Sequence, residues 1–295
     1  MLSLVSSGRD AVADLSLAIS TSSDPVKGIL QGIKGLLEDA YPKYIAAMND
    51  VGTCCAIGLS VPQADALEGT YEALRTRASL KPIRDELLSL VDRLGSYCPL
   101  CGIEQASTLD HYVPKSAFPE FAIFHFNLIP CCSRCNQFKG KTSYGTVEDN
   151  LFIHPYFHAL DAYELLKAVL LQRSGTFYVE FRLDRPEGVP DLLFEKIENQ
   201  VNRIRLLQRI LGPAGTELAS HAQNCELFAA SGGTAMVVES CIRQADYWKG
   251  AAGTNHWRTA LYKAMSLSED FCSGGFLSFV PKYDADSNGL ISYGS

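Results

Sequence analysis

Two Cys-x-x-Cys pairs constrain this chain more than any other feature of its sequence. Cys98 and Cys101 form the first pair, and Cys132 and Cys135 form the second. Two such turns, about thirty residues apart, can present four thiolates tetrahedrally to one Zn²⁺ ion. Cys131 could replace Cys132, because a three-residue spacing is also tolerated, but the matching two-residue spacing favours Cys132. The pattern therefore predicts a structural zinc site.

The alternative for these cysteines is a redox dithiol pair. A redox pair would need a thioredoxin-like strand, turn and helix around one motif, and neither motif has that context. With four sulfur ligands the zinc ion has no open position, so it would stabilise the fold and any chemistry must come from other residues. Five further cysteines lie in apolar or helical surroundings, where a thiol usually behaves as a small buried apolar group: Cys54, Cys55, Cys225, Cys241 and Cys272.

Composition and charge limit the class of protein. The 295 residues are 47% apolar and 20% charged, which is enough to bury one large core or two modest ones. The formal net charge of −7 argues against a protein that coats nucleic acid by bulk electrostatics. No uninterrupted apolar run approaches the roughly 18 residues of a membrane helix, and no cation precedes the short apolar run at the N-terminus. We expect a cytoplasmic protein with neither a membrane contact nor a secretory signal.

The pattern of residues divides the chain into three segments. Residues 1–95 show helical periodicity, whereas residues 96–155 carry short β-like runs, paired cysteines and clustered aromatics. Residues 156–295 form a mainly helical region that includes an alternating strand at 176–183. Within it we expect a helix over 191–211 that Gly212 and Pro213 close. The predicted fold class is α+β, mostly helical.

The middle segment resembles a known family. Asp110 and His111, then Asn127, then Asn136 directly after Cys135, follow one another between and just after the cysteine pairs. This order resembles the HNH nucleases, also called ββα-metal nucleases, in the form whose zinc is held by two Cys-x-x-Cys pairs. The resemblance covers about fifty residues and implies a small zinc-stabilised ββα-metal core. It further implies that Asp110 and Asn136 bind the catalytic ion, that His111 is the general base, and that Asn127 holds the His111 loop by hydrogen bonds across the hairpin.

Physical chemistry is consistent with these roles. Phosphodiester hydrolysis needs a deprotonated water, a neutralised phosphorane and a leaving alkoxide, which one hard cation and one base can together provide. Carboxylate and amide oxygens suit Mg²⁺ or Mn²⁺, and a neutral imidazole suits proton abstraction. Strand geometry conflicts with these roles at one place. In a regular strand Asp110 and His111 would point to opposite faces, so the chain must bend between them. Pro114 makes an early strand end plausible.

Basic residues near the motif are candidates for substrate binding. Lys139 lies three residues after Asn136, so it shares that helix face and could contact a phosphate, and Arg134 lies beside the site. A further basic group has two interpretations, phosphate neutralisation or a solvated helix face: Arg75, Arg77, Lys81 and Arg84. His154 and His158 could approach the metal, but we interpret them as structural.

Together these features predict a metal-dependent endonuclease that cuts DNA with little sequence specificity, and they leave RNA open as an alternative substrate. A compact HNH core with helical extensions on both sides looks like the nuclease subunits of bacterial anti-phage systems, which work with an ATPase, so we expect such a partner. The alternative is a catalytically silent, zinc-stabilised module that binds nucleic acid or a partner. A third interpretation, a homing or restriction enzyme, would cut at defined sites.

Overall fold

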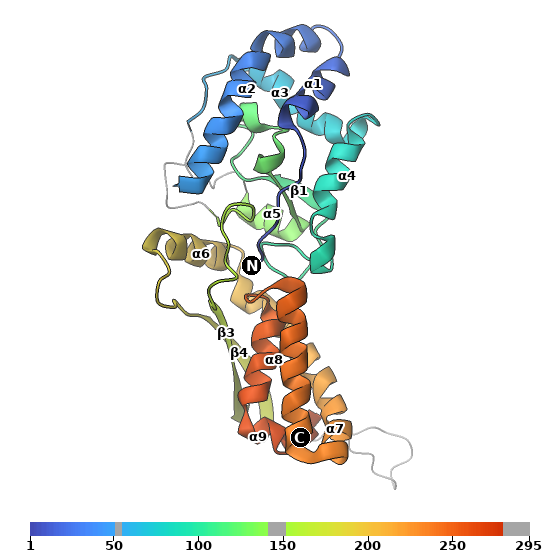
Figure 1. Ribbon diagram of the computed structural model, residues 1–295, viewed down its shortest axis with the longest axis vertical. Coiled ribbons are helices and arrows are strands. Elements are labelled where there is room, and N and C mark those ends of the chain that lie inside the picture. Colours follow the sequence, from blue (N-terminus) through green and yellow to red (C-terminus); the bar gives the residue numbers. More distant parts are fainter. Residues whose placement is uncertain (51–54, 141–151, 280–295) are drawn as a thin grey trace. The chain divides into compact units, whose positions relative to one another are not determined.

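The computed structural model describes residues 1–50, 55–140 and 152–279, and it has the mostly helical α+β fold that the sequence predicts (Figure 1). The chain forms two compact units. Unit 1 contains residues 1–160 and 189–204, and unit 2 contains residues 161–188 and 205–295. The sequence patterns change at residues 95 and 155, and both of these positions lie inside unit 1.

Four helices precede the cysteine pairs in unit 1: α1 (Ala11–Ser20), α2 (Val26–Asp50), α3 (Val61–Thr76) and α4 (Lys81–Ser89). Local signals fix where they begin. The Asp10 carboxylate accepts hydrogen bonds from the first backbone N–H groups of α1. Ser60 and Gln63 form a reciprocal capping box at the start of α3. The apolar faces of the four helices pack into one core.

The helices share this core with the phenylalanine-rich loop at residues 118–126 and with apolar side chains at residues 109–113 and 128–129. Tyr41 stacks on Phe124 with ring centroids 4.2 Å apart, and Tyr44 meets Phe121 at 4.8 Å. Phe118 is also buried. The phenylalanine-rich loop therefore anchors the middle segment to α2. Its rings pack in the core and do not face solvent.

The middle segment of unit 1 is a ββα arrangement. Strand β1 (Thr108–His111) pairs antiparallel with β2 (Leu128–Cys131), and helix α5 (Ser133–Lys139) follows directly. Short 3₁₀ helices precede and connect the strands: η1 (Asp92–Leu94), η2 (Pro119–Phe121) and η3 (His125–Asn127). Helix α6 (Asp191–Arg203) completes the unit.

Helix α6 supports the cysteine region from a distant part of the sequence. The Gln200 amide donates to the Leu100 carbonyl at 3.1 Å, inside the first cysteine turn. The Arg203 guanidinium donates to the carbonyls of Phe138 and Lys139 at the end of α5. A cation at this position satisfies C-terminal carbonyls and complements the helix dipole.

Unit 2 combines a hairpin with helices. Strands β3 (Leu166–Arg173) and β4 (Thr176–Leu183) pair antiparallel, and both residues of the intervening turn have positive φ. The helices are α7 (Leu206–Ala252), α8 (Trp257–Leu267), α9 (Glu269–Cys272) and the 3₁₀ helix η5 (Gly275–Phe279).

Helix α7 differs from the sequence-based expectation in two ways. The helix expected over 191–211 ends at Arg203, and a new one begins after Arg205, whose φ is 52°. Gly212 and Pro213 do not end it, because Pro213 lies within the next helix. The break comes instead at Gly232 and Gly233, which have φ values of −163° and +66°, so α7 consists of two legs.

Among the described residues, α7 is the one helix that is long and apolar enough to cross a membrane by length and composition. Its most apolar window is 17% buried. Because the glycine break interrupts it, the apolar sequence does not form one straight helix. A cytoplasmic location stays a prediction.

Candidate metal centre and adjoining polar site

The four cysteines that the sequence predicts as zinc ligands lie together. Cys98, Cys101, Cys132 and Cys135 are all buried, and their Sγ atoms lie within 4.8 Å of one another. The Sγ atoms of Cys101 and Cys132 are 3.9 Å apart. Zn–S bonds of about 2.3 Å in tetrahedral geometry give S–S separations of about 3.8 Å. The cluster is compatible with a structural zinc ion.

The backbone around the thiols is shaped for this cluster. The Cys132 thiol caps α5 by accepting from the Cys135 N–H at 3.3 Å, and the Gly102 N–H closes the first turn onto the Cys98 carbonyl at 2.7 Å. Gly102 has a φ of 65°, which favours glycine. Burial raises the pKa of the Cys98 thiol well above its ordinary value.

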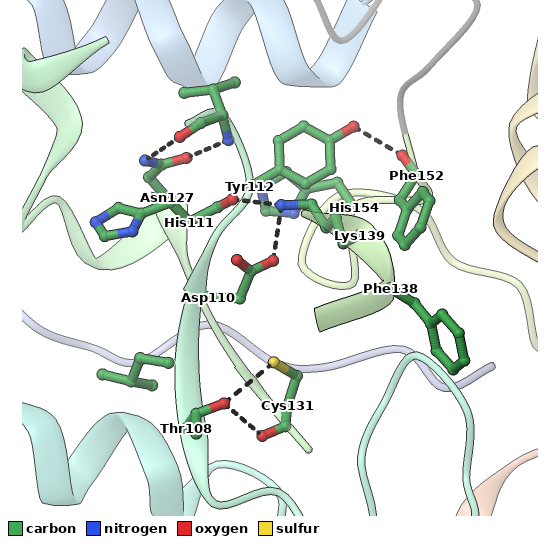
Figure 2. A network of polar contacts seen from close by, with 12 residues as sticks. Thr108, Asp110, His111, Tyr112, Asn127, Cys131, Phe138, Lys139, Phe152 and His154 are labelled. Atoms are coloured by element: carbon green, nitrogen blue, oxygen red, sulfur yellow. Dashed lines mark hydrogen bonds and ion pairs between the residues drawn. The ribbon is translucent and has the colours of Figure 1, made fainter. Parts of the chain in front are cut away.

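Cys131 lies outside the cluster. Its thiol is 3.5 Å from the Thr108 hydroxyl, on the neighbouring strand, and burial raises its pKa (Figure 2). The choice of Cys132 over Cys131 as the zinc ligand agrees with the cluster.

His111 is the last residue of β1, and its imidazole has a fixed orientation. Nε2 lies 2.9 Å from the Ala122 carbonyl oxygen, which can only accept, so Nε2 carries the hydrogen and Nδ1 is the basic nitrogen. The Tyr71 ring packs edge-on against the imidazole, with centroids 4.3 Å apart. Burial lowers the pKa of His111 to about 3. The imidazole is therefore neutral at pH 7 and can accept a proton, but a pKa this far below 7 makes it a weak base.

Asn127 makes the hydrogen bonds across the hairpin that the resemblance implies. Its Oδ1 accepts from the Val113 N–H at 2.8 Å, and its Nδ2 donates to the Val113 carbonyl at 3.1 Å (Figure 2). The same Nδ2 donates to the Phe121 carbonyl, also at 3.1 Å. The Tyr44 hydroxyl also donates to Oδ1, at 3.1 Å. Val113 follows His111 by two residues and Phe121 precedes Ala122, so Asn127 fixes both sides of the His111 environment.

Asp110 has a cationic partner. Lys139 Nζ lies 2.7 Å from Asp110 Oδ2 and also donates to the His111 carbonyl (Figure 2). The side chains of Lys139 and Asp110 are only 6% and 14% exposed. The lysine expected to contact a phosphate thus joins α5 to β1 in this structure.

The bend expected between Asp110 and His111 is not present. Strand β1 stays paired through its last two residues, with Asp110 opposite Ile129 and His111 opposite Leu128. The two side chains therefore leave the strand on opposite sides, and Figure 2 shows the carboxylate directed toward Lys139 and the imidazole directed away from it. The physical reason is that pairing with β2 keeps the strand regular, while Tyr71 and Ala122 hold the imidazole on its own side.

Asn136 lines a cleft of about 310 Å³ beside β1. Arg75 from α3 and Arg84 from α4 line the same cleft, together with Tyr71, Leu74, Ser107, Thr108 and Leu109. The remaining basic residues have structural or solvated positions. Arg77 donates to the Thr21 carbonyl, and the exposed Arg134 guanidinium lies 3.8 Å from the Glu104 carboxylate. The cleft therefore combines an amide with two guanidinium groups.

Sequence reasoning missed two tyrosines at this site. The Tyr71 hydroxyl donates to the Leu109 carbonyl at 2.5 Å, and burial raises its pKa to about 12. The Tyr44 hydroxyl lies between Asn127 and His154 Nε2, 3.1 Å from each. Both come from the N-terminal helices, and no local motif connects them with the later histidines. His154 is fully buried against Tyr44, in agreement with its interpretation as structural.

Comparison with known proteins adds one relative. The chain is similar to protein ea31 of Escherichia phage lambda, with 28% identity over 221 residues that cover 70% of this chain and 74% of that protein. No family model matches the chain. No solved structure matches it.

Proposed function

We propose that this protein is a metal-dependent HNH-type endonuclease that hydrolyses phosphodiester bonds of DNA with little sequence specificity. The main support is His111, a neutral imidazole held in one tautomer by the Ala122 carbonyl, on a ββα unit that a zinc-type cluster and Asn127 stabilise. A fixed tautomer matters because it leaves Nδ1 ready to accept a proton from water. The deprotonated water attacks phosphorus, and the bond to the leaving oxygen breaks.

The donor set fits a hard divalent cation. Asp110 offers a carboxylate, Asn136 offers an amide oxygen, and both lie where α5 packs on β1. Lys139 pairs with Asp110 in this structure, so a metal ion would have to displace the ammonium from the carboxylate. A bound Mg²⁺ or Mn²⁺ would neutralise charge on the phosphoryl and leaving oxygens. Arg75 and Arg84 would attract the phosphate backbone to the cleft beside Asn136.

One observation favours a second candidate function, a catalytically silent zinc-stabilised binding module. Lys139 already neutralises Asp110, and the regular strand directs Asp110 and His111 to opposite sides. In such a module the same contacts would serve stability alone, and the cleft would bind nucleic acid or a partner without cutting it.

Plasmid cleavage separates these two functions. The purified chain with Mg²⁺ or Mn²⁺ should nick or cut plasmid DNA, and His111→Gln should abolish the cutting while the zinc content and melting temperature stay close to wild type. His125→Gln is the matched control, because His125 is also a buried imidazole of unit 1 with a depressed pKa. Equal cleavage by His111→Gln and wild type would reject His111 as the base. Absence of cleavage of DNA and RNA by the wild type would favour the silent module, and discrete fragments would indicate a site-specific enzyme.

We further propose that an ATPase partner in an anti-phage defence complex delivers the substrate. The net charge of −7 implies that the isolated chain binds DNA weakly and in a salt-sensitive manner, and a partner would overcome this weakness. Purification of the protein from its native cells tests the idea. A free monomer with full nuclease activity would remove the need for a partner.

A further inference from the structure

Unit 2 contains another cluster of metal-ligating side chains, separate from the cysteine pairs. His221, Cys225 and Cys241 are buried, and their ligand atoms lie within 4.8 Å of one another. His221 and Cys225 are one helical turn apart on the first leg of α7, so their side chains share a face. Cys241 lies on the second leg, and the break at Gly232 and Gly233 allows that leg to return beside the first.

The spacing of these atoms suits zinc. His221 Nε2 and Cys241 Sγ are 3.6 Å apart. A tetrahedral ion with a Zn–N bond of about 2.0 Å and a Zn–S bond of about 2.3 Å separates its nitrogen and sulfur ligands by about 3.5 Å. We propose that His221, Cys225 and Cys241 bind a structural Zn²⁺ ion in unit 2.

Cys272 is the candidate for the fourth ligand. It lies in α9, is 2% exposed, and its thiol interacts with the thiol of Cys241. Its Sγ also lies 3.2 Å from the Met265 carbonyl oxygen. With Cys272 the ion would have three sulfurs and one nitrogen, a common set for structural zinc, and it would connect both legs of α7 to α9.

The surroundings hold the His221 ring in one position. The Tyr262 ring packs edge-on against it at 5.0 Å, and the Tyr262 hydroxyl donates to Glu217 at 2.6 Å, which fixes that ring.

An interpretation as buried apolar cysteines explains less. It accounts for the burial of Cys225, Cys241 and Cys272, and the Ser240 hydroxyl gives His221 Nε2 a partner at 3.3 Å, but it does not account for the convergence of one imidazole and two thiols within 4.8 Å of one another. Cys55 departs from that interpretation altogether, because it is exposed. This difference makes Cys55 the natural control residue.

Zinc stoichiometry tests the proposal on the full chain. Elemental analysis of protein purified under reducing conditions should give two zinc ions per chain, one for each cluster. Cys225→Ser and His221→Asn should each reduce the count to one, and Cys55→Ser should leave it at two. Cys98→Ser should also leave one ion, which the additional change Cys225→Ser then removes.

Three results would overturn the proposal. One is a wild-type count of one zinc ion that Cys225→Ser leaves unchanged. A second result comes from the wild-type protein and so does not depend on whether a variant folds. X-ray absorption at the zinc edge should show a nitrogen ligand in addition to sulfur, and a shell of sulfur alone would exclude the histidine site. Alkylation and mass mapping that found Cys225 or Cys272 joined to Cys241 as a disulfide in the native protein would also overturn it.

Discussion

Replacing Asn127 with alanine tests whether this side chain holds the His111 environment together. Asn127 is fully buried, and both the N–H and the carbonyl of Val113 depend on its amide. The other two partners keep alternatives, because the Phe121 carbonyl still accepts from Phe124 and the Tyr44 hydroxyl still contacts His154. The Val113 N–H and carbonyl would lose their hydrogen-bond partner, at about 1–3 kcal/mol each, and a small cavity would remain. We therefore expect the free energy of unfolding to fall by about 3–5 kcal/mol.

Urea unfolding of the full chain measures this loss. The exposed Asn49, whose amide makes one bond to its own helix, provides the matched control, and Asn49→Ala should change the free energy of unfolding by less than about 0.5 kcal/mol. Asn127→Asp should fall between alanine and wild type, because a carboxylate accepts from Val113 but cannot donate to a carbonyl. A loss below about 1 kcal/mol for Asn127→Ala would show that the hydrogen bonds across the hairpin contribute little, and would refute the reasoning.

Three further predictions concern unit 1. Chelation of zinc should unfold the β1, β2 and α5 region, seen as lost amide-exchange protection there, and retained protection would contradict a structural ion. Burial lowers the pKa values of His111, His125 and His158 to about 3, 4 and 4, below the ordinary 6.5. As the pH falls below 6.5, these imidazoles take up protons in the unfolded chain before they do so in the folded one. The free energy of unfolding should therefore be highest above pH 6.5 and fall toward pH 4. An unchanged pH dependence in a His125→Gln, His158→Gln double variant would contradict this. Lys139→Met leaves the Asp110 carboxylate without its cation and should lower the free energy of unfolding by about 3–5 kcal/mol. Addition of Mn²⁺ should restore the melting temperature of this variant, and the further change Asp110→Asn should prevent that recovery.

Local sequence spacing was sufficient for the parts of this protein that a few neighbouring residues determine. The two cysteine turns each need only their own four residues, so the zinc-type cluster and the choice of Cys132 over Cys131 followed from the sequence. The same holds for Asn127, whose place in the motif implied its bonds across the hairpin. Helical periodicity likewise indicated a mostly helical α+β fold, because each amphipathic pattern repeats within one element.

Contacts between distant segments were decided by the tertiary structure. Tyr71 reaches His111 from α3, and Lys139 binds Asp110 because α5 packs across β1, and neither pairing has a local signature. The direction of His111 depended on how far β1 stays paired with β2, which the residues of β1 alone do not determine. His221 and Cys241 meet because α7 breaks at two glycines, so a cluster whose members are scattered in the sequence forms only when the two legs pack together.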